Sequence, residues 1–104
     1  MLGITFKENC PDIRNTKVVD VYRELRDYNM QVDVYDPWAD KDQVNAEYGI
    51  KLLPSFNPED YQGVLITVSH TQFVDIDYAA FKTANAVLFD TKAIVDRTLV
   101  DARL

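Results

Sequence analysis

Short apolar runs alternate with segments of helical periodicity along this chain of 104 residues. The run from Leu2 to Phe6 is typical of a buried parallel strand, and Val64 to Val68 is the strongest strand of this kind. One helix is expected after a cap at Asn15 or Thr16. The remaining expected segments are strands at 31–36, 50–53 and 86–89, helices at 40–48 and 77–83, and an open choice of loop or helix at 94–100.

This alternation predicts an α/β fold with right-handed crossovers between parallel strands. We expect a Rossmann-like parallel sheet of about five strands, with helices on both faces and the strand order 3-2-1-4-5. The first strand would then lie in the middle of the sheet. Because the chain has the length of one small domain, residues 1–104 are expected to fold as a single unit.

Composition limits the possible partners. Hydrophobic residues make up 47% of the chain, which is enough for a core. The net charge is -6 and lysine and arginine are scattered, so nucleic acid is not an expected partner. No apolar stretch approaches the roughly 20 residues that span a membrane. The single cysteine, Cys10, allows no internal disulfide, which fits a reducing cytoplasm.

Polar side chains follow the expected strands at the points where these strands end. They are Lys7, Asp36, Ser69, His70, Asp90, Thr91 and Lys92. The carboxyl ends of parallel strands meet at one edge of a sheet, where open α/β folds bind their ligands. A cationic group at this edge, close to the start of a helix, suits a phosphate-bearing ligand. Lys7 is therefore the best candidate for ligand contact.

Other residues near this edge have less clear roles. Asp12 and Arg14 can pair with each other or anchor the loop that contains them, and we expect a structural role for both. His70 can in principle act as a general base, but a lone loop histidine is more often a hydrogen-bonding surface residue. Cys10 has no histidine near it in the sequence and is expected to be passive.

The amino-acid sequence from Phe6 to Pro37 resembles that of a known family. Phe6-Lys7, then Asp12 and Arg14, a helix, a strand and Asp36-Pro37 resemble the C-terminal UDP-binding domain of the UDP-glucose/GDP-mannose dehydrogenase family. The stretch from Lys7 to Thr16 is most similar to the branch that oxidises UDP-N-acetylhexosamines. The chain then corresponds to a domain excised from a larger dehydrogenase.

The resemblance implies roles for individual residues. Phe6, Lys7 and Lys92 would contact the nucleotide sugar, with Lys92 in place of the arginine that the family often carries in an Asp-Gly-Arg-like turn. Asp12, Arg14, Asp36 and Asp90 would be structural or would support the site. No catalytic residue and no metal ligand is expected in this chain, because the family's catalytic groups lie in another domain.

The resemblance also implies an enzyme that this chain only partly represents. The parent would be an NAD-dependent UDP-sugar 6-dehydrogenase that oxidises the C6 alcohol to a uronate for polysaccharide biosynthesis. NAD would be bound by its N-terminal domain, and the parent is expected to be a cytoplasmic homo-oligomer. The 104-residue chain alone is expected to be inactive.

Two other classes of protein share parts of this pattern. A receiver-like phospho-acceptor domain has a hydroxyl after its fourth strand and a lysine after its fifth, which Thr67 or Ser69 and Lys92 would match. It also needs an acidic pair after the first strand to hold magnesium, where this chain has Phe6-Lys7. A complete nicotinamide-binding domain needs a Gly-x-Gly-x-x-Gly turn, and the glycines here are far apart.

Overall fold

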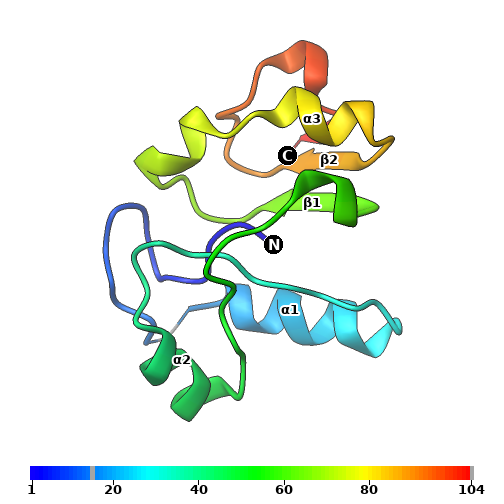
Figure 1. The fold of residues 1–104 in the computed structure, drawn as a ribbon. Coiled ribbons are helices and arrows are strands. Elements are labelled where there is room, and N and C mark those ends of the chain that lie inside the picture. The colour runs from blue at the N-terminus through cyan, green and yellow to red at the C-terminus, as the bar shows by residue number, and fades with distance from the viewer. Residues whose placement is uncertain (15, 104) are drawn as a thin grey trace.

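A three-stranded parallel sheet forms the regular part of the fold in the computed structural model, which describes residues 1–14 and 16–103. The strands are β1 (Gly63–Ile66), β2 (Val87–Asp90) and β3 (Ala102–Arg103), in the order β1-β2-β3. Gly63 pairs with Val87 and Phe89 pairs with Ala102. Figure 1 shows α3 (Tyr78–Thr83) beside β1 and β2, with the two other α-helices on the far side of the N-terminal segment.

Local sequence signals explain where the helices begin and end. Asp40 caps α2 (Lys41–Tyr48) by accepting from the amides of Asp42 and Gln43, and Gly49 ends it with a φ of 70°. Asp77 caps α3 in the same way. For α1 (Val18–Asp27), the expected cap is wrong for Thr16: the N-cap position is Lys17, which makes no side-chain cap hydrogen bond, and the Thr16 hydroxyl just before it accepts from the Val18 amide at 3.2 Å. The alternative cap, Asn15, lies outside the described residues.

The expectation of five strands is wrong for the described residues, in which three strands form. The segments 2–6, 31–36 and 50–53 are joined only by single parallel bridges, which are Leu2 to Tyr35, Leu2 to Ile66 and Val34 to Leu52. Gly3 has a φ of 103°, which takes the backbone out of the extended region directly after Leu2. A ladder cannot continue through that residue, so pairing stops after one bridge.

The C-terminal part resolves the open choice between loop and helix at 94–100. These residues form no α-helix and contain only a 3₁₀ turn at Arg97–Leu99, capped by Asp96. The two-residue strand β3 follows it and was not expected. Further 3₁₀ turns lie at Pro58–Asp60 and Thr71–Asp75. The turn at Pro58 agrees with the helical turn that proline at the first position favours.

The core consists of two hydrophobic clusters that meet at the N-terminal segment. One contains Leu2 and the inward residues of β1, β2 and α3, and the other contains Ile4 with residues of α1 and α2. In a regular strand Leu2 and Ile4 would face the same side. Here the turn at Gly3 sends them into different clusters, so this glycine connects the two halves of the core.

We expect the substitution Gly3→Ala to destabilise the chain strongly. A Cβ atom at Gly3 would lie 2.5 Å from the Val68 Cβ, and the φ of 103° is unfavourable for any L side chain. Overpacking and the strained backbone together predict a loss of about 2–4 kcal/mol in the free energy of unfolding, measured by urea titration.

Gly49→Ala is the matched control. Its φ of 70° is also positive, but nothing lies within 4 Å of the added Cβ. We expect it to cost only about 1 kcal/mol, as for an alanine in a helix-ending turn. Equal losses for the two variants would show that the contact with Val68 does not limit this position.

Candidate functional site

Four loops lie on one side of the molecule, at the left in Figure 1. They follow the N-terminal segment, the segment of residues 34–36, the strand β1 and the strand β2. The blue loop after Phe6 and the loop after Asp36 approach the chain just after β1. This is the carboxyl edge of the parallel sheet, where open α/β folds bind ligands. We call these loops the carboxyl-edge loops.

A buried carboxylate, Asp36, connects three of the carboxyl-edge loops. It is only 6% exposed. Its Oδ2 accepts from the amide of Ile4 at 2.7 Å, the amide of Thr5 at 3.2 Å and Nε2 of His70 at 2.9 Å. Its Oδ1 accepts from the amides of Trp38 at 2.8 Å and Ala39 at 3.1 Å. Asp36 therefore has donors from three separate parts of the chain and no free face for a ligand.

The hydrogen bonds also set the ionisation of this carboxyl group. Burial by itself would raise the pKa of Asp36, but the hydrogen bonds from His70, Ile4 and Trp38 outweigh burial and hold this pKa below 3.8, its usual value. Asp36 is thus ionised near neutral pH. Its negative charge is compensated inside the protein by N–H donors, as buried charges require.

His70 is fully buried, so its description as a surface residue is wrong. Its Nδ1 accepts from the Asn9 amide at 3.0 Å, and a ring nitrogen that accepts carries no proton. The ring is therefore neutral, with its proton on Nε2 directed at Asp36. Trp38 stacks on the ring and Phe73 meets it edge-on, with centroids 6.2 Å and 5.1 Å away.

Thr5, His70 and Asp36 together superficially resemble a nucleophile, base and acid. Both oxygen partners, however, meet the same nitrogen, because Thr5 Oγ1 lies 3.2 Å and Asp36 Oδ2 lies 2.9 Å from Nε2. A catalytic relay needs its nucleophile and its carboxylate on opposite ring nitrogens. All three side chains are also buried, which removes them from any substrate. The cluster holds loops together.

The sequence-predicted ligand residues Phe6 and Lys7 lie on the first carboxyl-edge loop and face solvent. Phe6 is 58% exposed, which is unusual for a phenylalanine, and Lys7 is exposed as well. Their backbone is held from both sides. The Phe6 amide donates to the Asp12 carbonyl at 2.7 Å, and the Lys7 carbonyl accepts from the Thr5 hydroxyl at 2.9 Å.

Lys92 is exposed on the loop after β2. Its amide donates to Oδ1 of Asp90, and Oδ2 of this fully buried carboxylate accepts from the Val95 amide at 2.8 Å. Ala93, just after Lys92, adopts a φ of 56°, whereas Thr91, which stands where the family carries a glycine, does not have a positive φ. Among residues 1–14 and 16–103, no hydrogen bond or ion pair joins Lys92 to the loop of Lys7.

Asp12 and Arg14 pair with each other. The Arg14 amide and Nε donate to Oδ1 of Asp12 at 2.9 and 3.1 Å, and Nη2 donates to Oδ2 at 3.3 Å. The side-chain hydrogen bond from Arg14 is the main reason why the pKa of Asp12 is lowered. Since the guanidinium is largely solvated, the pair adds little stability and shapes the end of the loop.

Sequence patterns did not reveal Asn9 and Thr71, which join two carboxyl-edge loops. The Asn9 amide group donates to Thr71 Oγ1 at 2.8 Å, and the Thr71 backbone amide donates to Asn9 Oδ1 at 2.9 Å. Asn9 has a φ of 53°, a conformation that asparagine tolerates better than most residues. The only available signal was an asparagine in a polar loop, a residue that tolerates a positive φ.

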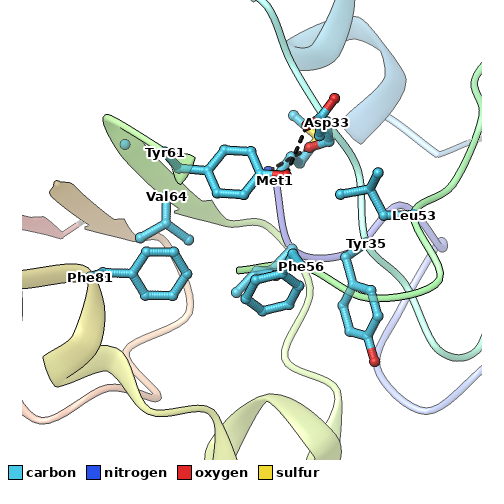
Figure 2. A pocket seen from close by; sticks show the side chains of 10 residues that line it. Met1, Asp33, Tyr35, Leu53, Phe56, Tyr61, Val64 and Phe81 are labelled. Carbon is cyan, nitrogen blue, oxygen red and sulfur yellow. Dashed lines mark hydrogen bonds between the residues drawn. The ribbon is translucent and has the colours of Figure 1, made fainter. Parts of the chain in front are cut away.

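A small cavity lies away from the carboxyl-edge loops. Figure 2 shows the rings of Phe56, Tyr61 and Phe81 around it, together with Met1 and Asp33. The hydroxyl of Tyr61 donates to Asp33 at 2.8 Å, and burial is the main reason why the pKa of Tyr61 rises to about 12. The cavity measures about 20 Å³, which holds about one water molecule and excludes a nucleotide.

Within residues 1–14 and 16–103, no three His, Cys, Asp or Glu side chains gather in a way that would hold a metal ion. No helix in this part of the chain has the length and apolarity needed to cross a membrane.

The geometry defines a class of protein, an α/β domain whose parallel strands end in loops that expose Phe6 and Lys7. The model of the UDP-glucose/GDP-mannose dehydrogenase family, UDP binding domain, matches residues 1–97. The chain belongs to this family. Its resemblance at Phe6, Lys7, Asp12 and Arg14 is thereby confirmed at the level of the family, and the receiver-like alternative is not supported.

Similar proteins agree with this assignment. The chain is 43% identical to UDP-N-acetyl-D-glucosamine 6-dehydrogenase of Pseudomonas aeruginosa over 107 residues, which cover 100% of the chain and 25% of that enzyme. It is 41% identical to the enzyme of the same name from Salmonella typhi, again over 100% of the chain and 25% of the relative. The chain therefore spans about a quarter of the length of these relatives.

Solved structures share the fold. The UDP-N-acetyl-mannosamine dehydrogenase Cap5O of Staphylococcus aureus superposes with a TM-score of 0.71 and 26% identity, covering 98% of this chain and 24% of that one. A UDP-D-ManNAc dehydrogenase from Pyrococcus horikoshii gives a TM-score of 0.75 at 18% identity, over 98% and 23% of the two chains.

We expect Asp36→Asn to lower the free energy of unfolding by about 2–4 kcal/mol, because an amide nitrogen would face N–H donors that now meet a carboxylate. Asp40→Asn is the control, since asparagine caps a helix as well as aspartate does. Urea titration of both variants at neutral pH measures the difference. Equal stability of the two variants would contradict the role given to Asp36.

The lowered pKa of Asp36 also predicts a pH dependence. The pKa is lower in the folded chain than the 3.8 of an ordinary aspartate, so ionised Asp36 contributes stability that is fully present above about pH 5. This contribution is lost as the pH falls below 3.8 and through the lowered pKa. Asp36→Asn should therefore flatten the acid limb of stability against pH, whereas an unchanged limb would exclude Asp36 as its source.

Proposed function

We propose that this chain is the C-terminal UDP-sugar-binding domain of an NAD-dependent nucleotide-sugar 6-dehydrogenase. The observation that carries the proposal is the family match over residues 1–97, in which Phe6 and Lys7 are exposed on an ordered carboxyl-edge loop. Two similar enzymes act on UDP-N-acetyl-D-glucosamine, which supports a UDP-N-acetylhexosamine as the substrate class.

The proposed contacts divide between charge and apolar surface. UDP carries a pyrophosphate, and the ammonium of Lys7 supplies a cation in a chain whose net charge is -6. Phe6 offers an exposed ring to the nucleotide sugar. Lys92 supplies a second cation from the loop after β2, without the bidentate geometry that an arginine would give. Asp12, Arg14, Asp36 and Asp90 hold the loops that carry these contacts.

The residues of this chain do not fit NAD. A dinucleotide turn needs three closely spaced glycines between a strand and a helix. Gly3 is used instead for packing against Val68, and α1 begins only at Val18, well after the N-terminal segment. We therefore assign NAD to another domain of the parent enzyme. We also infer from the single bridges that the parallel segments lie side by side in the order 50–53, 31–36, 2–6, β1, β2 and β3, with regular strand pairing only from β1 to β3.

The parent reaction is a four-electron oxidation of the sugar C6 alcohol to a carboxylate, with the electrons passing to two NAD. This chain contributes binding and orientation, and a cysteine elsewhere in the parent carries the covalent step. The product is a uronate for polysaccharide biosynthesis. We expect the parent to be a cytoplasmic homo-oligomer.

The purified chain of 104 residues should produce no NADH from any UDP-sugar. Its sequence has no dinucleotide turn, and residues 1–14 and 16–103 contain no accessible nucleophile and base in hydrogen-bonding contact. The assay follows NADH absorbance with UDP-N-acetylglucosamine, UDP-N-acetylmannosamine and UDP-glucose, with the full-length parent as positive control. Turnover by the chain alone would contradict the assignment of NAD binding and catalysis to other domains of the parent.

In the full-length parent, Lys7→Ala should lower kcat/KM by about one to two orders of magnitude, because a lost charge-assisted contact costs roughly 1.5–3 kcal/mol. Steady-state kinetics with the UDP-sugar measures the effect. Asp20→Ala is the control, since Asp20 is exposed on α1 and should change stability by less than about 0.5 kcal/mol.

Circular dichroism must show that both variants are folded before their kinetics are compared. A folded Lys7→Ala enzyme with the kinetics of Asp20→Ala would identify Lys7 as a solvated loop residue. The proposed site would then be wrong.

A further inference from the structure

We propose that His70 is a positioning residue for Lys7. Its neutral ring hydrogen-bonds the loop of residues 5–9 to the chain after β1 and so fixes the backbone position from which the Lys7 side chain extends. The inference rests on the proposed function of Lys7. In this proposal a buried histidine without contact to solvent affects the affinity of the enzyme for the nucleotide sugar.

Contacts on both sides of Lys7 carry this inference. On one side, Thr5 Oγ1 lies 3.2 Å from Nε2 of His70 and donates to the Lys7 carbonyl at 2.9 Å. On the other side, the Asn9 amide donates to Nδ1 of His70 at 3.0 Å, and its side chain exchanges two hydrogen bonds with Thr71. Lys7 is thus bracketed by residues that the His70 region holds.

The tether requires one acceptor and one donor on the same ring. Nδ1 must be free of a proton to accept from Asn9, while Nε2 must carry one to meet Asp36. Asp36 is the titratable group in hydrogen-bonding contact with the ring. The aromatic side chains of Trp38 and Phe73 cover other sides of it. A second proton on the ring would remove the acceptor and release Asn9.

His70 cannot act on a ligand directly because it is 0% exposed. Lys7, Glu8 and Asn9 are all exposed, so apolar burial gives this part of the loop little support. The hydrogen bonds to His70 and Thr71 therefore decide its conformation. An ordered Lys7 backbone reduces the entropy that is lost when the lysine binds a phosphate.

Two substitutions separate the two ring nitrogens. His70→Asn places an amide oxygen near the position of Nδ1 and can keep the Asn9 contact, while it loses the donor to Asp36. His70→Gln reaches the position of Nε2 and can keep the donor to Asp36, while it leaves the Asn9 amide without an acceptor. His70→Asn should be the less stable of the two, because it removes a hydrogen bond to a buried carboxylate.

The inference predicts the opposite order for activity. In the full-length parent, His70→Gln should lower kcat/KM about tenfold, and His70→Asn should stay within about threefold of wild type. In a Lys7→Ala background, His70→Gln should add less than about a twofold loss, because it acts through Lys7. A role limited to stability would instead make activity follow the unfolding midpoint and would make the two losses multiply.

A measurement on the wild-type chain covers the case in which the variants do not fold. Nitrogen-15 NMR should show His70 with its proton on Nε2, and the Asn9 amide should exchange with solvent at least tenfold more slowly than the Glu8 amide. A proton on Nδ1, or equal exchange of Asn9 and Glu8, would overturn the inference. So would equal kcat/KM for His70→Gln and His70→Asn, or multiplicative losses with Lys7→Ala.

These outcomes are distinct from a failure of the proposed function. If Lys7→Ala has normal kinetics, both the proposed site and the positioning role are wrong. If Lys7→Ala is impaired but the two His70 variants behave alike, the site stands and only the positioning role is overturned.

Discussion

The carboxylate of Asp36 accepts hydrogen bonds from the N-terminal segment, from its own loop and from the histidine that follows β1. Ile4 and His70 lie thirty-two and thirty-four residues away from Asp36 along the sequence, yet one buried charge fixes their relative positions. A buried carboxylate without these donors would be strongly unfavourable, so each of the contacts helps to keep Asp36 buried and ionised. The Asp36 carboxylate therefore holds the loops at the carboxyl edge of the sheet in place.

A division between buried and exposed residues follows from that arrangement. Asp36, His70 and Thr5 are saturated with internal partners and leave no atom for a ligand. Phe6 and Lys7 are one or two residues away from Thr5 and are exposed. The buried residues supply rigidity, and we propose that the exposed ones contact the pyrophosphate and the sugar of the ligand. Thr5, His70 and Asp36, which superficially resemble a catalytic triad, therefore hold the loops of the proposed site in place.

The sequence predicted those features that depend on neighbouring residues. Asp40 and Gly49 were enough to place α2, and the motif of Phe6, Lys7, Asp12 and Arg14 was enough to indicate the family. Long-range features were not predictable in this way. His70 looked like a surface residue because its partner Asn9 is sixty-one residues away. Gly3 looked like part of a strand, since a positive φ leaves no mark in an apolar run.

The most direct test of the carboxyl edge as the nucleotide face is an NMR titration of the nitrogen-15-labelled chain with UDP. We expect weak binding, with a dissociation constant in roughly the millimolar range. The isolated chain would form only one side of the binding site, so most of the bound UDP would remain in contact with water. The largest amide shifts should fall at Phe6, Lys7 and Lys92. Shifts concentrated instead around Phe56 and Tyr61, with Lys7 unchanged, would contradict this assignment.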